Sequence, residues 1–288
     1  MSLSYGLLQS VDLVHPRLPP TLEGLRIAHL TDPHLPAGRR ATDRAVRQLG
    51  RVRIDLLVVT GDYMDRRANR GRAIAAARAL IDELGRAFRP RLGAFGVFGN
   101  HDHPDLIDPL LAAPAPDDGS RGVTWLVNAA TDMPDLHLRL AGLSDLGSVP
   151  ADAIRLSLGL VPAANVDDPP RPDAAAHERP FTLGLLHRPD RVVQAAALGI
   201  DLVLAGHSHG GQIRAPWGQC FHNSSDLPLR ATAGLMRHRD TLMAVSRGLG
   251  RTAWTPRLFC PPHLPIYTLR RGPLPTTDPA DVVCFRPW

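Results

Sequence analysis

Five short apolar segments of the sequence each end in a polar motif built from Asp, Asn and His. The segments span residues 25–30, 54–59, 92–98, 181–186 and 200–205, and the motifs after them contain Asp32, His34, Asp62, Asn100, His101, Asp102, His187, His207 and His209. Apolar runs of this length, bounded by turn residues, are typical of buried strands. Because parallel strands joined by right-handed crossovers bring their carboxyl ends to one edge of a sheet, we expect these polar side chains to converge there.

The residues between these segments carry helical periodicity. Apolar residues over 45–52 recur at helical spacing behind a Thr42-Asp43 pair that can cap a helix, and those over 74–88 mark a longer helix. The order strand, helix, strand, helix, strand predicts parallel βαβ units. Elsewhere we expect a strand or extended lead-in within 1–24, helices over 104–112, 151–160 and 192–197, strands over 123–127, 136–141, 241–245 and 266–269, a polar surface loop over 165–180, and an irregular Pro-rich tail from Pro273.

The basic residues exclude two classes of chemistry. All 33 of them are Arg, because the sequence contains no Lys. Schiff-base catalysis and Walker-type phosphate loops both need Lys, so neither operates here. The net charge is only +5 and the arginines are scattered rather than clustered, so no specific nucleic-acid partner is predicted.

Length, cysteine count and hydropathy limit the number of domains and the cellular compartment that we expect. A chain of 288 residues can bury a sizeable core, and we expect a single domain over residues 1–288. Three cysteines, an odd number at unpaired spacing, favour a reducing compartment, and no apolar run reaches the length of a membrane span. We therefore expect a cytoplasmic protein, in which a charge of +5 allows peripheral contact with the inner membrane surface. The oligomeric state stays open.

The polar motifs suit divalent metals. Carboxylates, an amide and imidazoles that meet in one crevice would repel one another or stay unsatisfied without a cation. Seven such donors exceed the needs of one tetrahedral zinc. They suit two divalent transition-metal ions bridged by a carboxylate and a water-derived hydroxide, which would attack phosphorus in line. We expect manganese first, with iron, zinc, cobalt or nickel as alternatives.

Taken in order, these motifs resemble the signature of the calcineurin-like metallophosphoesterases. The matching residues cover 25–211 and are Asp32-x-His34, Gly61-Asp62, Gly99-Asn-His-Asp102, His187 and Gly206-His-x-His209. The resemblance implies a four-layer α/β/β/α sandwich of two mixed β-sheets flanked by helices. It also implies an enzyme, a metal-dependent phosphoric ester hydrolase.

The resemblance assigns a role to each matching residue. Asp32, His34 and His209 would bind one metal, Asn100, His187 and His207 would bind the other, and Asp62 would bridge the two. His101 would be the general acid that protonates the leaving oxygen, and Asp102 would orient its ring.

Residues 22–27, 210–213, 245–250 and 256–258 are similar to one bacterial subgroup of this family. That subgroup includes phosphodiesterases and phosphohydrolases of UDP-diacylglucosamine-type lipids, which implies a small-molecule or lipid-linked phosphoester substrate. The chain departs from the subgroup at Pro36, where a Gly is usual, at Ser208, where a Thr is usual, and at His263, where the tail often has Glu. None of these departures changes a proposed metal ligand. They leave the identity of the substrate open.

Two other functions are compatible with parts of the sequence. Gly206-His-Ser208-His-Gly210 fits the G-x-S-x-G elbow of serine hydrolases, with Asp226, Asp240 and His263 downstream. An elbow needs a following helix, which Gly210-Gly211 and Pro216 oppose. The second alternative is a metal-binding scaffold without catalysis, which would be expected to lack ligands or the acid.

The lining of the site has two interpretations. A lipid-linked substrate needs an apolar rim, which the loops at 103–122 and 144–180 could supply through Leu106, Ile107, Leu110, Leu111, Ile154, Leu158 and Leu160. The same residues could equally pack two short helices onto the body. His29 lies inside the first strand and is expected to be structural.

Overall fold

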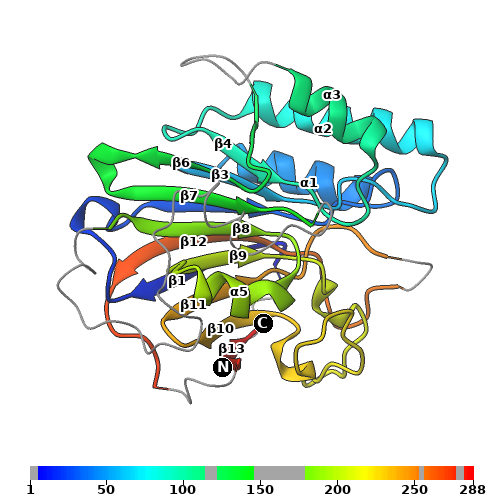
Figure 1. Ribbon diagram of the computed structural model, residues 1–288. Helices are drawn as coiled ribbons and strands as arrows, with labels where there is room; N and C mark the ends of the chain where they lie inside the picture. The colour runs from blue at the N-terminus through cyan, green and yellow to red at the C-terminus, as the bar shows by residue number, and fades with distance from the viewer. Residues whose placement is uncertain (1–5, 114–121, 146–178, 253–255, 277–281) are drawn as a thin grey trace.

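Two β-sheets packed face to face, with helices on both outer sides, form the core of the computed structural model (Figure 1). This arrangement confirms the predicted sandwich of two mixed sheets. The structure describes residues 6–113, 122–145, 179–252, 256–276 and 282–288. The helix predicted over 151–160, and most of the loops predicted around 113–122 and 165–180, lie outside these residues.

The first sheet has six strands in the order β1-β12-β2-β3-β4-β5. Neighbours from β2 to β5 are parallel, as the predicted βαβ units require, whereas β12 pairs antiparallel with β2 and parallel with β1. The strands are β1 (Leu8–His15), β2 (Arg26–Leu30), β3 (Leu56–Thr60), β4 (Ala94–Val97), β5 (Thr124–Trp125) and β12 (Leu264–Arg271).

Three helices cover the outer face of this sheet: α1 (Arg39–Leu49), α2 (Arg70–Ala87) and α3 (Pro104–Ala112). The Thr42-Asp43 cap predicted for α1 is wrong, because the helix begins one turn earlier, after Gly38. Thr42 lies inside it, buried, and its hydroxyl donates to the Gly38 carbonyl at 3.0 Å. For α2, the Asn69 side chain caps the helix by accepting from the Arg72 N–H at 3.2 Å.

The second sheet has seven strands in the order β13-β10-β11-β9-β8-β7-β6. Its central strands β11, β9, β8 and β7 are parallel, and α5 (Val192–Ala197) packs on its outer face. The strands are β6 (Ala129–Met133), β7 (Leu138–Leu143), β8 (Phe181–Leu186), β9 (Leu202–Ala205), β10 (Gly234–His238), β11 (Thr241–Val245) and β13 (Val283–Pro287).

The irregular tail predicted from Pro273 is wrong at its end. Residues 283–287 form β13, which pairs antiparallel with β10 at the sheet edge. Trp288 behind it is buried between the sheets, and its indole N–H donates to the Val245 carbonyl at 3.0 Å. Proline is tolerated on an edge strand because only one side of such a strand forms a ladder.

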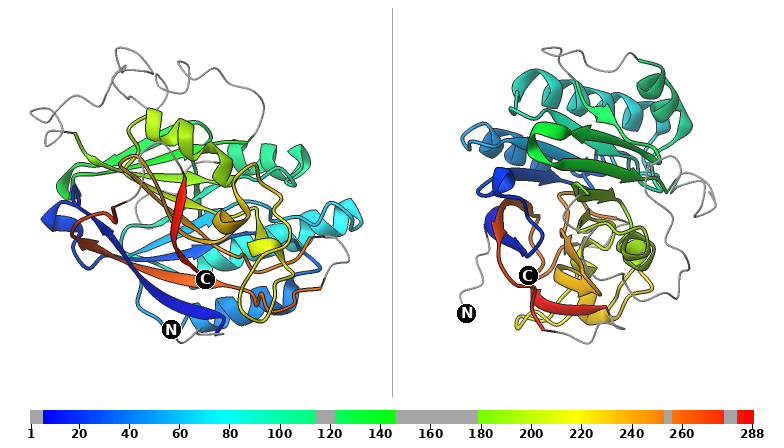
Figure 2. Two further views of the ribbon diagram at one scale, coloured as in Figure 1. Left: turned by 90° about the horizontal axis from the view of Figure 1, so that it is seen from below. Right: turned by 60° about the vertical axis from the view of Figure 1, so that its left-hand side comes forward.

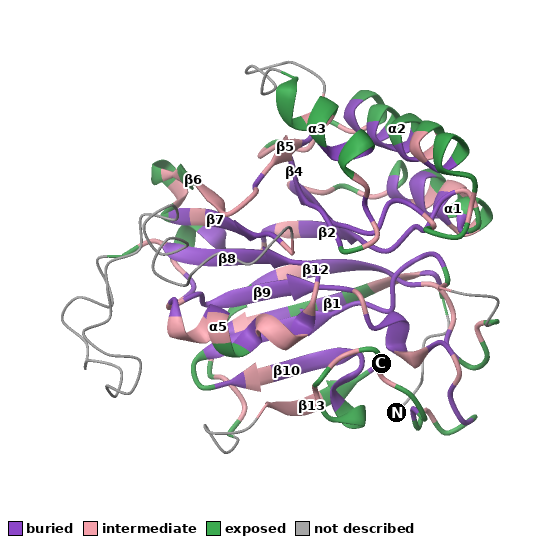
Figure 3. Ribbon diagram, turned by 45° about the vertical axis from the view of Figure 1, so that its right-hand side comes forward, coloured by how far each residue is buried: buried purple, intermediate pink, exposed green. Residues whose placement is uncertain are grey.

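Three apolar layers hold the sandwich together. One lies between the sheets and includes Ile27, Leu183, Leu204 and Tyr267, a second lies under α1–α3, and a third lies under α5. Figure 2 shows the resulting stack from two further sides, and Figure 3 shows that the strands are buried while the outer helix faces are exposed. Among the described helices, none has the length and apolar character needed to cross a bilayer.

Candidate metal centre

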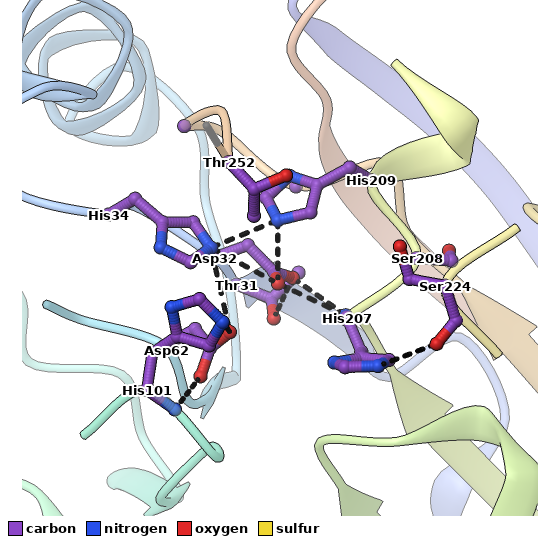
Figure 4. Close-up of polar contacts among 12 residues, drawn as sticks. Thr31, Asp32, His34, Asp62, His101, His207, Ser208, His209, Ser224 and Thr252 are labelled. Atoms are coloured by element: carbon purple, nitrogen blue, oxygen red, sulfur yellow. Dashed lines mark hydrogen bonds and ion pairs between the residues drawn. The ribbon is translucent and has the colours of Figure 1, made fainter. Parts of the chain in front are cut away.

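The predicted ligands come from the ends of strands in both sheets. Asp32 and His34 follow β2 and Asp62 follows β3 in the first sheet, whereas His187 follows β8 and His207 follows β9 in the second. The convergence therefore occurs across the sandwich, with each sheet contributing one wall (Figure 4).

These residues adopt strained backbone conformations. A positive φ, which is uncommon outside glycine, occurs at five of them: Asp32 (53°), His34 (43°), Asp62 (55°), His207 (67°) and His209 (52°). Such strain costs free energy and clusters at functional sites, where the surrounding fold maintains it. The glycines next to these residues make room for the carboxylates: a Cβ on Gly206 would lie 2.2 Å from Asp32 Oδ2, and one on Gly99 would lie 2.2 Å from Asp62 Oδ1.

Asp32, His34 and His209 form a first buried cluster. The Nε2 atoms of His34 and His209 face each other at 2.9 Å, and Asp32 Oδ1 lies 3.4 Å from His209 Nε2 and 3.9 Å from His34 Nε2 (Figure 4). Two imidazole nitrogens directed at one point beside a carboxylate are a donor set suited to a divalent cation.

Asp62, His187 and His207 form a second cluster. His187 Nε2 lies 3.2 Å from Asp62 Oδ2 and 3.2 Å from His207 Nδ1. The two clusters meet at Asp62, because its Oδ2 also lies 3.5 Å from His34 Nε2. Each cluster brings its ligand atoms within 4.8 Å of one another. Six nitrogen or oxygen donors in two adjacent clusters, with the Asp62 carboxylate between them, fit two divalent metal ions.

Hydrogen bonds from outside the clusters orient two of the imidazoles. His34 Nδ1 lies 3.2 Å from the Met64 carbonyl oxygen and His187 Nδ1 lies 2.7 Å from that of Thr60. Each carbonyl can only accept, so Nδ1 of both rings carries a proton. In the neutral form of each ring, Nε2 is then the nitrogen that presents a lone pair to the site. Arg257 adds a contact that the sequence analysis missed, since its Nη2 lies 3.2 Å from His209 Nδ1.

Burial and mutual charge set the protonation of the site. Burial lowers the pKa of His34 to about 4, that of His207 to about 4, and that of His209 well below its usual range, so all three rings are neutral near pH 7. Burial also opposes charge on His187, but the adjacent Asp62 carboxylate outweighs it and raises the pKa of His187 to about 10. Conversely, His187 and its neighbours overcome the burial of Asp62 and keep the pKa of that carboxyl below its ordinary value.

His101 lies at the edge of this arrangement. Its backbone N–H donates to Asp62 Oδ1 at 2.8 Å, its ring Nε2 lies 4.0 Å from Asp62 Oδ2, and its side chain is 23% exposed. The ring lines a cavity of about 380 Å³ together with His34, Arg66 and Arg67. A molecule bound in this cavity would meet the ring of His101, the metal cluster and two exposed guanidinium groups.

Asp102 is placed differently from the expectation that it orients the His101 ring. Its carboxylate accepts hydrogen bonds from the backbone N–H groups of Asp62 at 3.0 Å, Tyr63 at 2.8 Å, Met64 at 3.2 Å and Gly99 at 2.9 Å. Within the described residues, His101 Nδ1 is buried without a hydrogen-bond partner. Asp102 therefore holds the backbone from which Asp62 and His101 project.

Asn100 is exposed and lines a second cavity, of about 260 Å³, beside His101 and Asp102. No hydrogen bond among the described residues joins its side chain to the clusters. Of the predicted metal ligands, Asn100 is the one that makes no described side-chain contact with either cluster.

Ser208 does not have the surroundings of a nucleophile. Its hydroxyl is buried and donates to the Thr232 carbonyl, and a short 3-10 turn, His209–Gly211, follows in place of a helix. His263 Nδ1 lies 3.3 Å from Ser246 Oγ, so the described contacts assemble no Ser–His–acid triad around Ser208. The serine-hydrolase alternative fails on this geometry.

Comparison with known proteins agrees with this geometry. The sequence model of the calcineurin-like phosphoesterase family matches residues 25–211. The uncharacterized metallophosphoesterase YkoQ of Bacillus subtilis is 24% identical over 254 residues, which are 87% of this chain and 85% of that protein. Phosphodiesterase YaeI of Escherichia coli is 29% identical over 75% of this chain and 70% of its own length. UDP-2,3-diacylglucosamine pyrophosphatase LpxG of Chlamydia muridarum is 26% identical over 84% of this chain and 83% of its own length.

Proposed function

The chain belongs to the calcineurin-like phosphoesterase family, whose members are metal-dependent phosphoric ester hydrolases, and we propose that it works through a dinuclear centre. The observation that carries this proposal is the pair of three-residue clusters that meet at Asp62, whose Oδ2 lies 3.2 Å from His187 Nε2 and 3.5 Å from His34 Nε2. Asp32, His34 and His209 would hold one ion, and His187 and His207 would hold the other. Asn100 would become a further ligand of the second ion once its side chain turns inward. We propose manganese as the first candidate metal.

In the proposed reaction a phosphoester is hydrolysed by in-line attack of water. When bound, the two cations neutralise phosphoryl oxygens and lower the pKa of a coordinated water. His101 would donate a proton from its ring to the leaving oxygen, since it lines the cavity with His34 and its Nε2 lies 4.0 Å from Asp62 Oδ2. Asp102 would act as a positioning residue through the backbone of residues 62–64. Arg66 and Arg67 would attract the anionic substrate.

For the substrate, we propose a lipid-linked or nucleotide-linked phosphoester that is met at a membrane surface. The relative LpxG is named as acting on a diacylated nucleotide sugar. Exposed apolar side chains also occur on the segment that follows His209, where Trp217 is 74% and Phe221 is 60% exposed. This segment pairs with residues 256–259 through the Ile213–Leu258 bridge, which adds Leu258 and Phe259.

The apolar rim predicted from α3 is only partly present. Leu106 and Ile107 are buried under α3 and Leu110 is partly buried, so they pack the helix onto the body, whereas Leu111 is 44% exposed. Ile154, Leu158 and Leu160 lie outside the described residues. We propose that the exposed aromatic residues Trp217 and Phe221 serve in place of the rim that the sequence predicted.

This substrate class is tested by comparing cleavage of a UDP-acyl-glucosamine with that of its deacylated counterpart, with and without anionic vesicles. We expect the acylated compound to have the higher kcat/KM, and the advantage to shrink in a Trp217→Ser, Phe221→Ser double variant. Val193→Ser, which changes a 53% exposed side chain on α5, is the matched control and should keep the advantage. Equal kcat/KM for both compounds would refute the lipid assignment and favour a soluble phosphodiester.

A further inference from the structure

A group of unpaired polar atoms lies buried between the sheets, apart from the metal clusters. Four side-chain atoms have no hydrogen-bond partner among the described residues: His29 Nδ1, Arg247 Nη2, His263 Nε2 and Tyr267 Oη. The exposed fractions of these residues are 0%, 5%, 0% and 0%. Buried polar atoms are nearly always paired with protein, water or an ion, so four orphans together need an explanation.

Strand geometry and ring contacts bring these residues to one place, the inter-sheet polar cluster. Tyr267 on β12 pairs with Ile27 on β2, and His29 lies two residues beyond Ile27, so both side chains point between the sheets. The His29 and Tyr267 rings are 6.0 Å apart, and the Trp288 ring lies 6.4 Å from Tyr267 and 5.5 Å from His263. The guanidinium of Arg247 acts electrostatically on both Tyr267 and His263.

The cluster carries a positive charge that no described carboxylate offsets. Arg247 Nε donates to the Pro261 carbonyl at 3.1 Å, and no carboxylate of the described residues lies within 4.0 Å of this guanidinium. Burial, with Arg214 and Arg257 nearby, lowers the pKa of Arg247 to about 10, which still leaves it protonated at neutral pH. The nearby Cys260 thiol donates to the His209 carbonyl at 3.3 Å.

Each of the orphaned atoms can donate a hydrogen bond. Arg247 Nη2 can only donate. Ser246 Oγ accepts from the Gly248 N–H at 3.1 Å and lies 3.3 Å from His263 Nδ1. When the Ser246 hydroxyl donates to that nitrogen, His263 Nε2 carries the ring proton and is a donor as well. The Thr60 hydroxyl lies 2.7 Å from His29 Nε2, and when it donates to that nitrogen His29 Nδ1 carries the ring proton. A single water accepts only two such bonds and would need acceptors for its own protons.

We propose that the inter-sheet polar cluster binds a small inorganic monoanion, chloride under ordinary conditions. Several converging donors and an uncompensated buried guanidinium are the chemistry that a halide requires. The site would stabilise the packing of β2 and β12 against the Trp288 end of the second sheet. It is distinct from the proposed metal centre, because none of its four residues belongs to the metal clusters.

Thermal unfolding of the full chain in chloride, bromide or gluconate at constant ionic strength tests this proposal. A ligand that binds only the folded state raises Tm with its concentration. We expect a saturable rise of Tm in chloride and bromide over gluconate, and an anomalous bromide peak among the four side chains in a crystal. Absence of any halide-specific rise, or water in place of the bromide peak, would overturn the proposal.

Two variants separate an anion site from a general salt effect. His263→Glu supplies a carboxylate beside Arg247, so its Tm in gluconate should rise toward the halide value and its halide dependence should vanish. Arg247→Met removes the charge and should also abolish the dependence. Arg51→Met, at an exposed position, is the control and should keep it in full. A halide-dependent Tm that survives unchanged in both cluster variants would place the anion elsewhere and refute the site.

Discussion

Replacing Asp62 by asparagine should abolish phosphoester hydrolysis and weaken metal binding at both clusters together. Asp62 Oδ2 lies 3.2 Å from His187 Nε2 in one cluster and 3.5 Å from His34 Nε2 in the other, so one carboxylate contributes negative charge to both. Loss of a residue that only supports a ligand typically costs about 10–100-fold in metal affinity or activity. Loss of the shared ligand should exceed about 100-fold in kcat/KM, measured beside metal content by elemental analysis.

Asp65→Asn is the matched control for this variant. Asp65 lines the cavity of about 380 Å³ beside His101, but its carboxylate accepts from the Arg67 N–H at 3.0 Å and belongs to neither cluster. This variant should retain its metal. If Asp62→Asn kept a full complement of metal, or lost one ion while the other bound with unchanged affinity, the bridging role would be wrong.

Replacing His101 by alanine should slow turnover by about 10²–10⁴ without loss of metal, the usual contribution of a general acid. The substitution removes the ring but keeps the backbone N–H that donates to Asp62 Oδ1, so the metal clusters should stay intact. The loss should be large for an alkyl phosphoester, whose leaving oxygen needs a proton, and small for a nitrophenyl ester.

The role of His101 is tested by comparing the rate loss on the alkyl ester with that on the nitrophenyl ester. Single-turnover rates on the two esters, with metal content measured on the same samples, separate proton donation from metal binding. Equal losses on both esters, or a loss of metal, would instead make His101 a substrate-binding or metal-binding residue.

The sequence predicted most of what positions the site, because strand ends are local features. The apolar runs before Asp32, Asp62 and His187 became β2, β3 and β8, and their polar ends meet, although from two facing sheets and not at the edge of one sheet as expected. The parallel βαβ units followed from periodicity alone. The pairing of two sheets did not, since it depends on which apolar faces meet; it came from the family resemblance and is confirmed by the strand order.

Features that depend on contacts across the fold escaped the sequence. Arg257 contacts His209 from 48 residues away, and no local pattern signals that contact. Asp102 was expected to orient its neighbour His101, whereas its carboxylate accepts from backbone N–H groups about 40 residues earlier. The prolines after residue 272 suggested an irregular tail. The strand β13 forms there only because the fold places β10 beside it, and no local pattern indicates that pairing.

The central claim, a dinuclear centre that hydrolyses phosphoesters, is tested most directly by titrating metal-free protein with Mn²⁺. Bound metal and hydrolysis of a phosphodiester model substrate would be measured on the same samples. We expect close to two ions per chain at saturation, with activity absent from the metal-free protein and rising as the second ion binds. Saturation at one ion, or hydrolysis that proceeds unchanged in the metal-free protein, would contradict it.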